Sequence, residues 1–250
     1  MNQNAIAARN TRLRDLTPAR VGLAITGISQ QTGDLLSFQS AHARARDAVH
    51  AKLDAYTLTA EIKAVTGNPV LTLRSKAADR ATYLQRPDLG RELSEESRRL
   101  LAASSGNHCD LAIVVADGLS ALAVHRHVVP LLQILVPTLA SYALAPVCIV
   151  EQGRVAIGDA IGEALDASLA IVLIGERPGL SSPDSLGAYI TWNPRIGRKD
   201  AERNCISNIR GEGLTYAEAA KQLAFYINEA SRRKITGIAL KEDANRLGEG

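Results

Sequence analysis

The sequence has few cysteines, few aromatic residues and no long uninterrupted hydrophobic run. Cys109, Cys148 and Cys205 stand far apart in the 250 residues and form no CxxC pair. This argues against a disulfide scaffold and favours a reducing compartment. Aromatic residues make up only 4% of the chain, which is poor for a surface that stacks nucleic-acid bases. The most apolar stretch, HVVPLLQILVPTLA, is broken by prolines and a glutamine, so no membrane-spanning segment is expected.

Strong charge and the common nucleotide-binding motifs are also lacking. The formal net charge is +3, and the basic residues are interspersed with acids, so no nucleic-acid partner is predicted. Neither GxGxxG nor GxxxxGK[ST] occurs, which disfavours NAD and ATP bound by their usual routes. The opening segment MNQNAIAARNTRLRDL has no apolar core, so no secretory signal is expected.

What the sequence does contain is an alternation of buried strands and helices. Near-continuous, β-branched apolar runs occur at 111–118, 146–153 and 169–179, separated by helical segments at 119–142 and 157–166. Such runs are typical of parallel strands that are buried on both faces. Shorter strands are predicted in VLTLRS, after Pro69, and in GAYITW at 187–192. The pattern predicts an α/β fold with a mostly parallel sheet.

Helical patterns mark both ends of the chain. A helix is predicted over 34–53 with Asp34 as its cap, followed by a second helix in DAYTLTAEIKAV. We therefore predict a helical N-terminal domain at 1–68 and an α/β domain at 69–250. The last helix should begin at a capping box formed by Thr215 and Glu218. In the first helix, apolar residues recur at helical spacing and form a stripe that consists of Leu35, Phe38, Ala41, Ala45 and Val49.

Polar residues and glycines follow each of the three long strands. The segments are 117–120 (DGLS), 152–155 (QGRV) and 175–179 (GERPG). Ligands of open α/β sheets bind at the carboxyl ends of the strands, so these segments predict one ligand-binding rim. The glycines alone could instead serve only to close tight turns. Cys205 lies in the polar, loop-like stretch AERNCISNIRGEG, where a site role and an ordinary surface role remain open.

No complete catalytic set is visible in the sequence. Ser120 follows a strand, but DGLSALA lacks the second glycine of a GxSxG nucleophile motif. His125 and His127 are two apart on a predicted helix and therefore point in different directions, which is unsuitable for a shared metal. A stand-alone hydrolase or transferase using Ser120 is thus disfavoured. The shortage is typical of a subunit that holds a cofactor for chemistry done elsewhere.

Several long stretches resemble the small (light) subunit of ethanolamine ammonia-lyase. They are FQSAHARARDAVH, YLQRPDLGREL, VVADGLSALAV, APVCIVEQGRVAIGDAIGEAL, VLIGERPGLSSPDSLGAYITWNPR and DAERNCISNIRGEGLTYAEAA, and they run in family order over roughly residues 18–240. The resemblance implies a Rossmann-like small subunit that closes over adenosylcobalamin against a large, barrel-shaped catalytic subunit in a hetero-oligomer. The enzyme converts ethanolamine to acetaldehyde and ammonia.

The resemblance also implies which residues contact the cofactor. The family's contact positions fall on Val155, Glu176 and Cys205, with Asp117 and Ser120 as weaker candidates on the same rim. Catalytic residues are expected on the large subunit, and no protein metal site is expected here. No DxHxxG motif occurs, which agrees with a cofactor bound with its own base on cobalt. The expected location is a bacterial microcompartment or the cytoplasm, and the alternative is a non-catalytic scaffold or regulatory partner that does not touch the cofactor.

Overall fold

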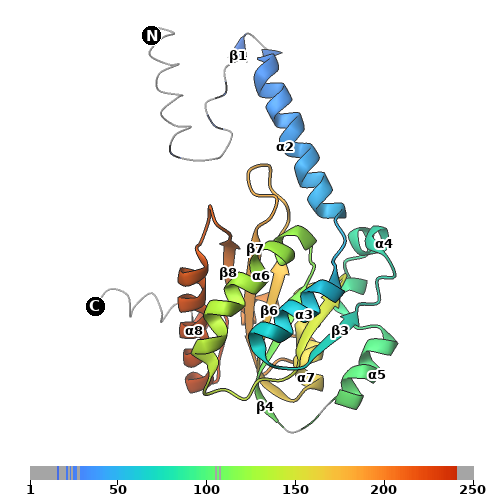
Figure 1. Ribbon diagram of the computed structural model, residues 1–250, viewed down its shortest axis with the longest axis vertical. Helices are drawn as coiled ribbons and strands as arrows, with labels where there is room; N and C mark the ends of the chain where they lie inside the picture. Colours follow the sequence, from blue (N-terminus) through green and yellow to red (C-terminus); the bar gives the residue numbers. More distant parts are fainter. Residues whose placement is uncertain are drawn as a thin grey trace, which may run out of the picture.

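The computed structural model describes residues 29–104, 106 and 108–240, together with positions 16, 21, 23, 25 and 26. These residues form an α/β fold built on one large mixed sheet (Figure 1). Its strands are β3 (Val70–Arg74), β4 (Cys109–Ala116), β5 (Val147–Glu151), β6 (Ala167–Gly175), β7 (Leu186–Trp192) and β8 (Asn204–Ile209). The helices are α2 (Thr32–His50), α3 (Ala55–Thr66), α4 (Arg80–Gln85), α5 (Glu95–Ser104), α6 (Ala121–Leu135), α7 (Ile157–Ala164) and α8 (Tyr216–Arg233). A two-stranded ribbon, β1 (Ile25–Thr26) and β2 (Ser29–Gln30), precedes them.

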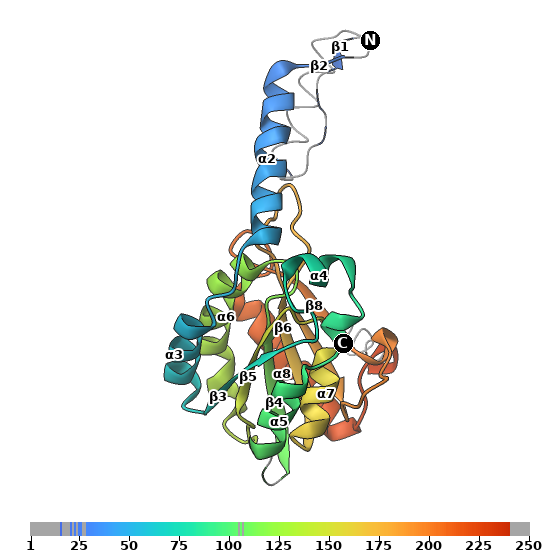
Figure 2. The ribbon, with the colours of Figure 1, turned by 90° about the vertical axis from the view of Figure 1, so that its right-hand side faces the viewer.

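The strand order of the large sheet is β3-β5-β4-β6-β7-β8. The first four strands are parallel, whereas β7 and β8 are antiparallel to their neighbours. The prediction of an α/β fold with a mostly parallel sheet is therefore confirmed. Helices cover both faces of this sheet (Figure 2), as parallel strands require because both of their faces are apolar.

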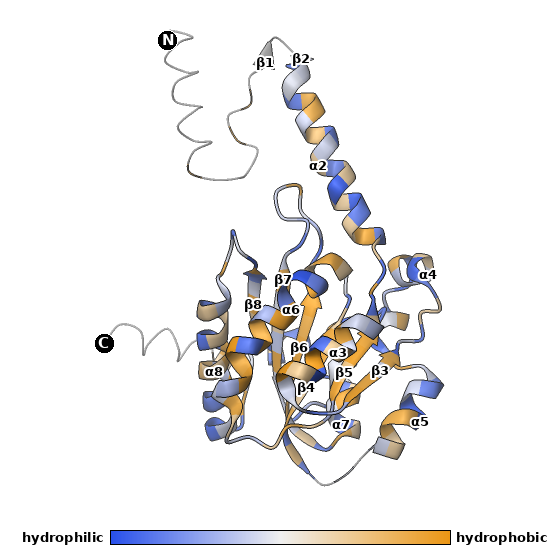
Figure 3. Cartoon of the chain, viewed as in Figure 1, coloured by the Kyte–Doolittle hydropathy of each residue, from blue (hydrophilic) through white to orange (hydrophobic). Residues whose placement is uncertain are grey.

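Two apolar cores lie on the two faces of the sheet. One contains residues of α3, α6 and α8, and the other contains residues of α5 and α7. Alternate residues of a strand enter opposite cores, as Ile113 and Val114 of β4 do. Cys148 of β5 is fully buried, as expected for a packing cysteine. The apolar residues accordingly concentrate along the strands in Figure 3.

Strand β8 was not predicted, because its sequence NCISNI has only a weak apolar pattern. In the structure Asn204, Ile206 and Ile209 are buried, whereas Cys205 and Ser207 are exposed. The strand lies at the end of the sheet, so one face and one edge do not need apolar side chains. The interpretation of Cys205 as a loop residue is therefore wrong, since Cys205 lies within β8.

Helix α2 projects from the body of the molecule (Figure 1). Its N-cap is Gln31 rather than the predicted Asp34, which lies within the first turn of the helix. Of the predicted apolar stripe only Ala41 is buried, and Leu35 and Phe38 remain 42% and 39% exposed. The stripe therefore does not form the buried face of a compact helical unit.

Helix α3 packs against the sheet rather than against α2. Leu58 and Ile62 of α3 are completely buried in the same core as α6. Asp54 caps this helix by accepting a hydrogen bond from the Thr57 amide, 3.1 Å away. Helix α3 therefore shares a core with residues after 69, and the division of the chain into domains at residue 68 stays a prediction.

Helix α6 has more buried residues than any other helix in the described part of the chain. Together with the 3-10 turn Val136–Leu139 it is long and apolar enough, by length and composition alone, to cross a membrane. Eight of its residues are buried against the sheet and the neighbouring helices, and a core helix meets the same criterion. Ser120 caps it, with its hydroxyl oxygen 3.2 Å from the Ala123 amide.

Candidate functional site

The carboxyl ends of β4, β5 and β6 meet at the rim predicted from the sequence. A cavity of about 420 Å³, here called the rim cavity, opens between them. Tyr83, Arg154, Val155, Glu176, Tyr189 and Ser207 are among its lining residues. A second cavity of about 500 Å³ shares Arg154, Val155 and Tyr189 with the first, so the two adjoin.

Two glycines make the close approach of β4 and β6 possible at the floor of the rim. Gly118 has φ of +56°, and a Cβ there would lie 2.2 Å from the Gly175 carbonyl oxygen. A Cβ on Gly175 would lie 2.1 Å from the Ser120 carbonyl oxygen. The gap is instead closed by a hydrogen bond from the Leu119 amide to the Gly175 carbonyl, 2.9 Å long. These glycines therefore do more than close turns, since they bring two strand ends together under the cavity.

Glu176 uses its carboxylate to join β6 to β8. The Ser207 hydroxyl donates to Glu176 Oε1 at 2.5 Å, and the Asn208 amide donates to Oε2 at 3.2 Å. The Ser185 hydroxyl also donates to Oε2. The half-buried carboxylate is therefore fixed in position at the wall of the rim cavity.

Val155 and Cys205 approach the same region from opposite sides. Val155 is half-buried between β5 and α7 and lines both cavities. Cys205 is exposed on β8 directly opposite Tyr189 of β7. The pKa of the Tyr189 hydroxyl is raised, first by burial and then by the neighbouring Cys205 thiol, to which it is hydrogen bonded. Because Tyr189 lines both cavities, Cys205 adjoins the wall that Val155 and Glu176 also form.

Ser120 and Asp117 do not line the rim cavity. Ser120 is fully buried, and besides capping α6 its hydroxyl donates to the Pro183 carbonyl at 3.0 Å. Asp117 is also buried and faces a separate cavity of about 430 Å³ on the β3 side of the sheet. Its carboxylate accepts a hydrogen bond from the Gly153 amide at 3.1 Å and lies 3.6 Å from Arg80 Nη1. Both residues therefore support the turns at the strand ends and do not form the wall of the rim cavity.

Tyr83, Arg154 and Tyr189 were not singled out in the sequence. The Tyr83 hydroxyl donates to the Gly153 carbonyl at 3.0 Å, and the Arg154 guanidinium lies 4.2 Å from the centre of the Tyr83 ring. This stack holds the β5–α7 turn against α4 and presents Arg154 to both cavities. Tyr83 and Arg154 lie within the quoted stretches YLQRPDLGREL and EQGRVAIGD, but their pairing depends on tertiary structure.

The carboxyl group of Asp117 should make stability depend on pH. Burial raises its pKa from 3.8 to about 6, outweighing the opposing effects of the Gln152 backbone hydrogen bond and of Arg80. The folded state therefore favours the protonated acid. Its contribution to stability is complete below the unfolded pKa and is lost as the pH rises through about 6, a difference of about 3 kcal/mol.

Asp117→Asn tests this dependence because an amide keeps the oxygen that accepts from Gly153 but does not titrate. We expect the variant to lose less stability than the wild-type protein between about pH 4 and about pH 7. Urea unfolding at a series of pH values measures the difference. Parallel pH profiles for the two proteins would contradict the assignment.

Fold and site together define a class: an α/β protein with adjoining cavities of mixed polar and apolar character at its strand ends. Among the described residues, no group of three or more His, Cys, Asp or Glu side chains could hold a metal ion. Residues 7–241 match the model of the family described as Ethanolamine ammonia-lyase light chain (EutC). The chain belongs to this family, and it is therefore a subunit of a lyase.

Curated relatives agree over almost the whole chain. An ethanolamine ammonia-lyase small subunit of Xanthomonas campestris pv. campestris (strain B100) is 55% identical over 240 residues, which are 94% of this chain and 88% of that protein. The protein of the same name from Pseudomonas syringae pv. tomato (strain ATCC BAA-871 / DC3000) is 55% identical over 93% of this chain and 82% of its own. That of Ralstonia nicotianae (strain ATCC BAA-1114 / GMI1000) is 53% identical over 93% and 87%. A small subunit implies a partner subunit.

Proposed function

We propose that the chain is the small subunit of an adenosylcobalamin-dependent ethanolamine ammonia-lyase and that it closes the cofactor site against a large catalytic subunit. In this proposal its Rossmann-like sheet forms one side of a cobalamin site in a hetero-oligomer. One observation carries the proposal: Val155 and Glu176 line the same cavity, and Cys205 pairs with Tyr189 of its wall. Val155 and Cys205 are 50 positions apart in the sequence. The residues implied as cofactor contacts thus come together at the carboxyl ends of the strands.

The residues of the rim fit the chemistry of cobalamin. A corrin has broad apolar faces and an amide fringe, so its site needs apolar contacts beside hydrogen-bonding groups. Leu119, Val155 and Ile174 provide apolar surface, and Arg154 and Arg177 provide donors. Arg154 Nε is buried and has no hydrogen-bond partner in the described structure. A buried donor of this kind is costly unless a ligand satisfies it.

The cofactor, when bound, supplies the radical chemistry by which ethanolamine becomes acetaldehyde and ammonia. This chain would bind and orient it: Val155 by apolar contact, Arg154 by donation, and Glu176 by fixing Ser207 and Asn208 of β8 at the cavity wall. We assign no catalytic residue here, and Ser120 is buried as a helix cap. Residues that handle the substrate belong to the proposed large subunit. The compartment, a bacterial microcompartment or the cytoplasm, stays a prediction.

Reconstitution tests the proposal against a scaffold or regulatory role without cofactor contact. The chain is mixed with the matching large subunit, adenosylcobalamin and ethanolamine under anaerobic conditions, and acetaldehyde is measured. We expect product and tight cofactor retention only when both proteins are present. Full activity and retention by the large subunit alone would make this chain a scaffold and contradict the proposal.

Glu176→Ala should weaken cofactor retention by the complex roughly tenfold, because it leaves the Ser207 hydroxyl and the Asn208 amide without their acceptor and removes the contact between the end of β6 and β8. Glu176→Gln keeps one acceptor oxygen and should show a smaller loss. Equilibrium dialysis of adenosylcobalamin against the reconstituted complex measures both, and circular dichroism verifies folding. Normal retention by a folded Glu176→Ala complex would show that Glu176 does not support the site.

A further inference from the structure

The second cavity at the rim, here called the basic cavity, is rich in cations. Its lining includes Arg91, Arg154, Arg198 and Lys199 but only one acid, Asp200. Arg198 is paired with Glu202, and Asp200 lies 3.5 Å from Arg203 Nε. Among the described residues, Arg91, Arg154 and Lys199 form no ion pair with a carboxylate. The cavity therefore offers uncompensated positive charge.

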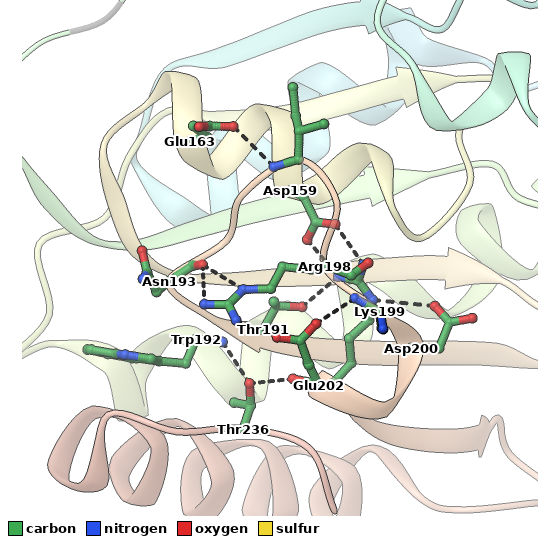
Figure 4. Close-up of polar contacts among 12 residues, drawn as sticks. Asp159, Glu163, Thr191, Trp192, Asn193, Arg198, Lys199, Asp200, Glu202 and Thr236 are labelled. Carbon is green, nitrogen blue, oxygen red and sulfur yellow. Dashed lines mark hydrogen bonds and ion pairs between the residues drawn. The ribbon is translucent and has the colours of Figure 1, made fainter.

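The loop that carries Lys199 is held firmly, although it lies outside the sheet. Arg198 donates from Nε and Nη2 to the Asn193 carbonyl, at 3.1 and 3.0 Å, and the Lys199 amide donates to Glu202 Oε2 at 2.7 Å (Figure 4). Beneath the loop, Arg203 Nη2 donates to the Arg198 carbonyl at 3.0 Å. The backbone of Lys199 is thus held at the cavity wall before any ligand arrives, so the loop itself need not be ordered on binding.

The part of the basic cavity formed by Arg154, Val155 and Ala156 is also suited to an anion. Val155 and Ala156 line it directly before α7, so the cavity lies at the N-terminal end of that helix, where the helix dipole favours negative charge. Arg154 is held by its stack on Tyr83 and by a 3.3 Å hydrogen bond from Nη2 to the Tyr83 carbonyl, yet its buried Nε has no partner among the residues that the structure describes. An unpaired buried guanidinium nitrogen at a basic cavity indicates an acidic ligand group.

We infer that the basic cavity binds a phosphate group, and that this group is the phosphodiester of the cofactor's nucleotide tail. The inference rests on the proposed function, because the basic cavity adjoins the rim cavity through Arg154, Val155 and Tyr189. One ligand then spans both: the corrin lies at the rim cavity, and its tail enters the basic cavity. Arg91, Arg154 and Lys199 are the binding residues for the phosphodiester.

Two ligands that differ in the tail test this assignment. Adenosylcobalamin carries the phosphodiester, and adenosylcobinamide lacks the nucleotide that contains it. Binding of each is measured by equilibrium dialysis against the complex of this chain with the large subunit. Arg91→Met and Lys199→Met should each weaken binding of adenosylcobalamin roughly tenfold and leave binding of adenosylcobinamide unchanged. Lys221→Met, at an exposed lysine of α8 outside both cavities, is the matched control.

The outcomes separate this inference from the proposed function. If Arg91→Met and Lys199→Met weaken binding of both ligands equally, or weaken binding of neither, the phosphodiester assignment is overturned while the cobalamin site stands. A wild-type complex that binds neither ligand would overturn the proposed function and this inference with it. Inorganic phosphate should weaken binding of adenosylcobalamin but not of adenosylcobinamide. If phosphate binds and is lost in Lys199→Met, yet does not compete with adenosylcobalamin, the cavity takes free phosphate and the assignment to the cofactor is wrong.

Discussion

Arg203→Met should lower the free energy of unfolding by about 3–5 kcal/mol, because it leaves a buried carboxylate without its counter-charge. Arg203 donates from Nη1 and Nη2 to the two oxygens of Asp159, each at 2.6 Å, and both side chains are only 2% exposed. Nη1 also donates to the Thr191 hydroxyl at 3.0 Å. Removing Arg203 therefore breaks the ion pair, a contact with β7 and the support of the loop that carries Lys199.

Urea unfolding monitored by the fluorescence of Trp192, the single tryptophan of the chain, measures this loss. Trp192 follows Thr191 at the end of β7, close to the ion pair. The double variant Asp159→Leu, Arg203→Met should regain much of the stability, because no buried charge is then left unpaired. A single variant that unfolds within about 1 kcal/mol of the wild-type protein would show that the pair contributes little.

Leu58→Ala should destabilise the whole α/β body by about 2–5 kcal/mol, because it opens a cavity in a core that α3 shares with α6. Leu58 is completely buried in that core. Leu36→Ala removes the same atoms from α2, where Leu36 is 59% exposed, and should change stability by less than about 0.5 kcal/mol.

Calorimetry and urea unfolding compare the two variants directly. If α3 contributes to the main core, Leu58→Ala should shift the single main transition to lower temperature and lower urea. A main transition that is unchanged in Leu58→Ala, with an earlier, separate transition for the N-terminal helices, would contradict this arrangement. It would then favour the predicted domain boundary at residue 68.

The central part of the fold could be predicted because its signals are local and strong. The apolar runs that became β4, β5 and β6 are nearly continuous, and the capping box of α8 at Thr215 and Glu218 is present in the structure. Strand β8 could not be predicted in the same way. Its polar residues satisfy contacts from distant segments: the Asn204 side chain, for example, exchanges two hydrogen bonds with Gly237.

The candidate site was predictable in its place but not in its contacts. The strand ends with glycines and charges located the rim, and the resemblance placed Val155, Glu176 and Cys205 on it. That Glu176 braces β8, and that Arg154 stacks on Tyr83, depends on segments dozens of positions away in the sequence. Helix α2 is present as predicted, but the exposure of its apolar stripe could not be predicted, for a related reason. Helical spacing of apolar residues shows that a helix has an apolar stripe, but it does not identify the surface that covers the stripe.

The close approach between the segment after β4 and the end of β6 also limits which substitutions this protein can accept in evolution. At Gly118 and at Gly175 even the smallest side chain would meet a backbone carbonyl oxygen at about 2 Å, and a backbone cannot swing aside as a flexible side chain does. No replacement confined to one of these positions is then neutral. Related proteins must keep both glycines or shift both strands at once. The sequence at Gly118 and Gly175 should therefore vary far less among relatives than the sequence of the loops around the cavity.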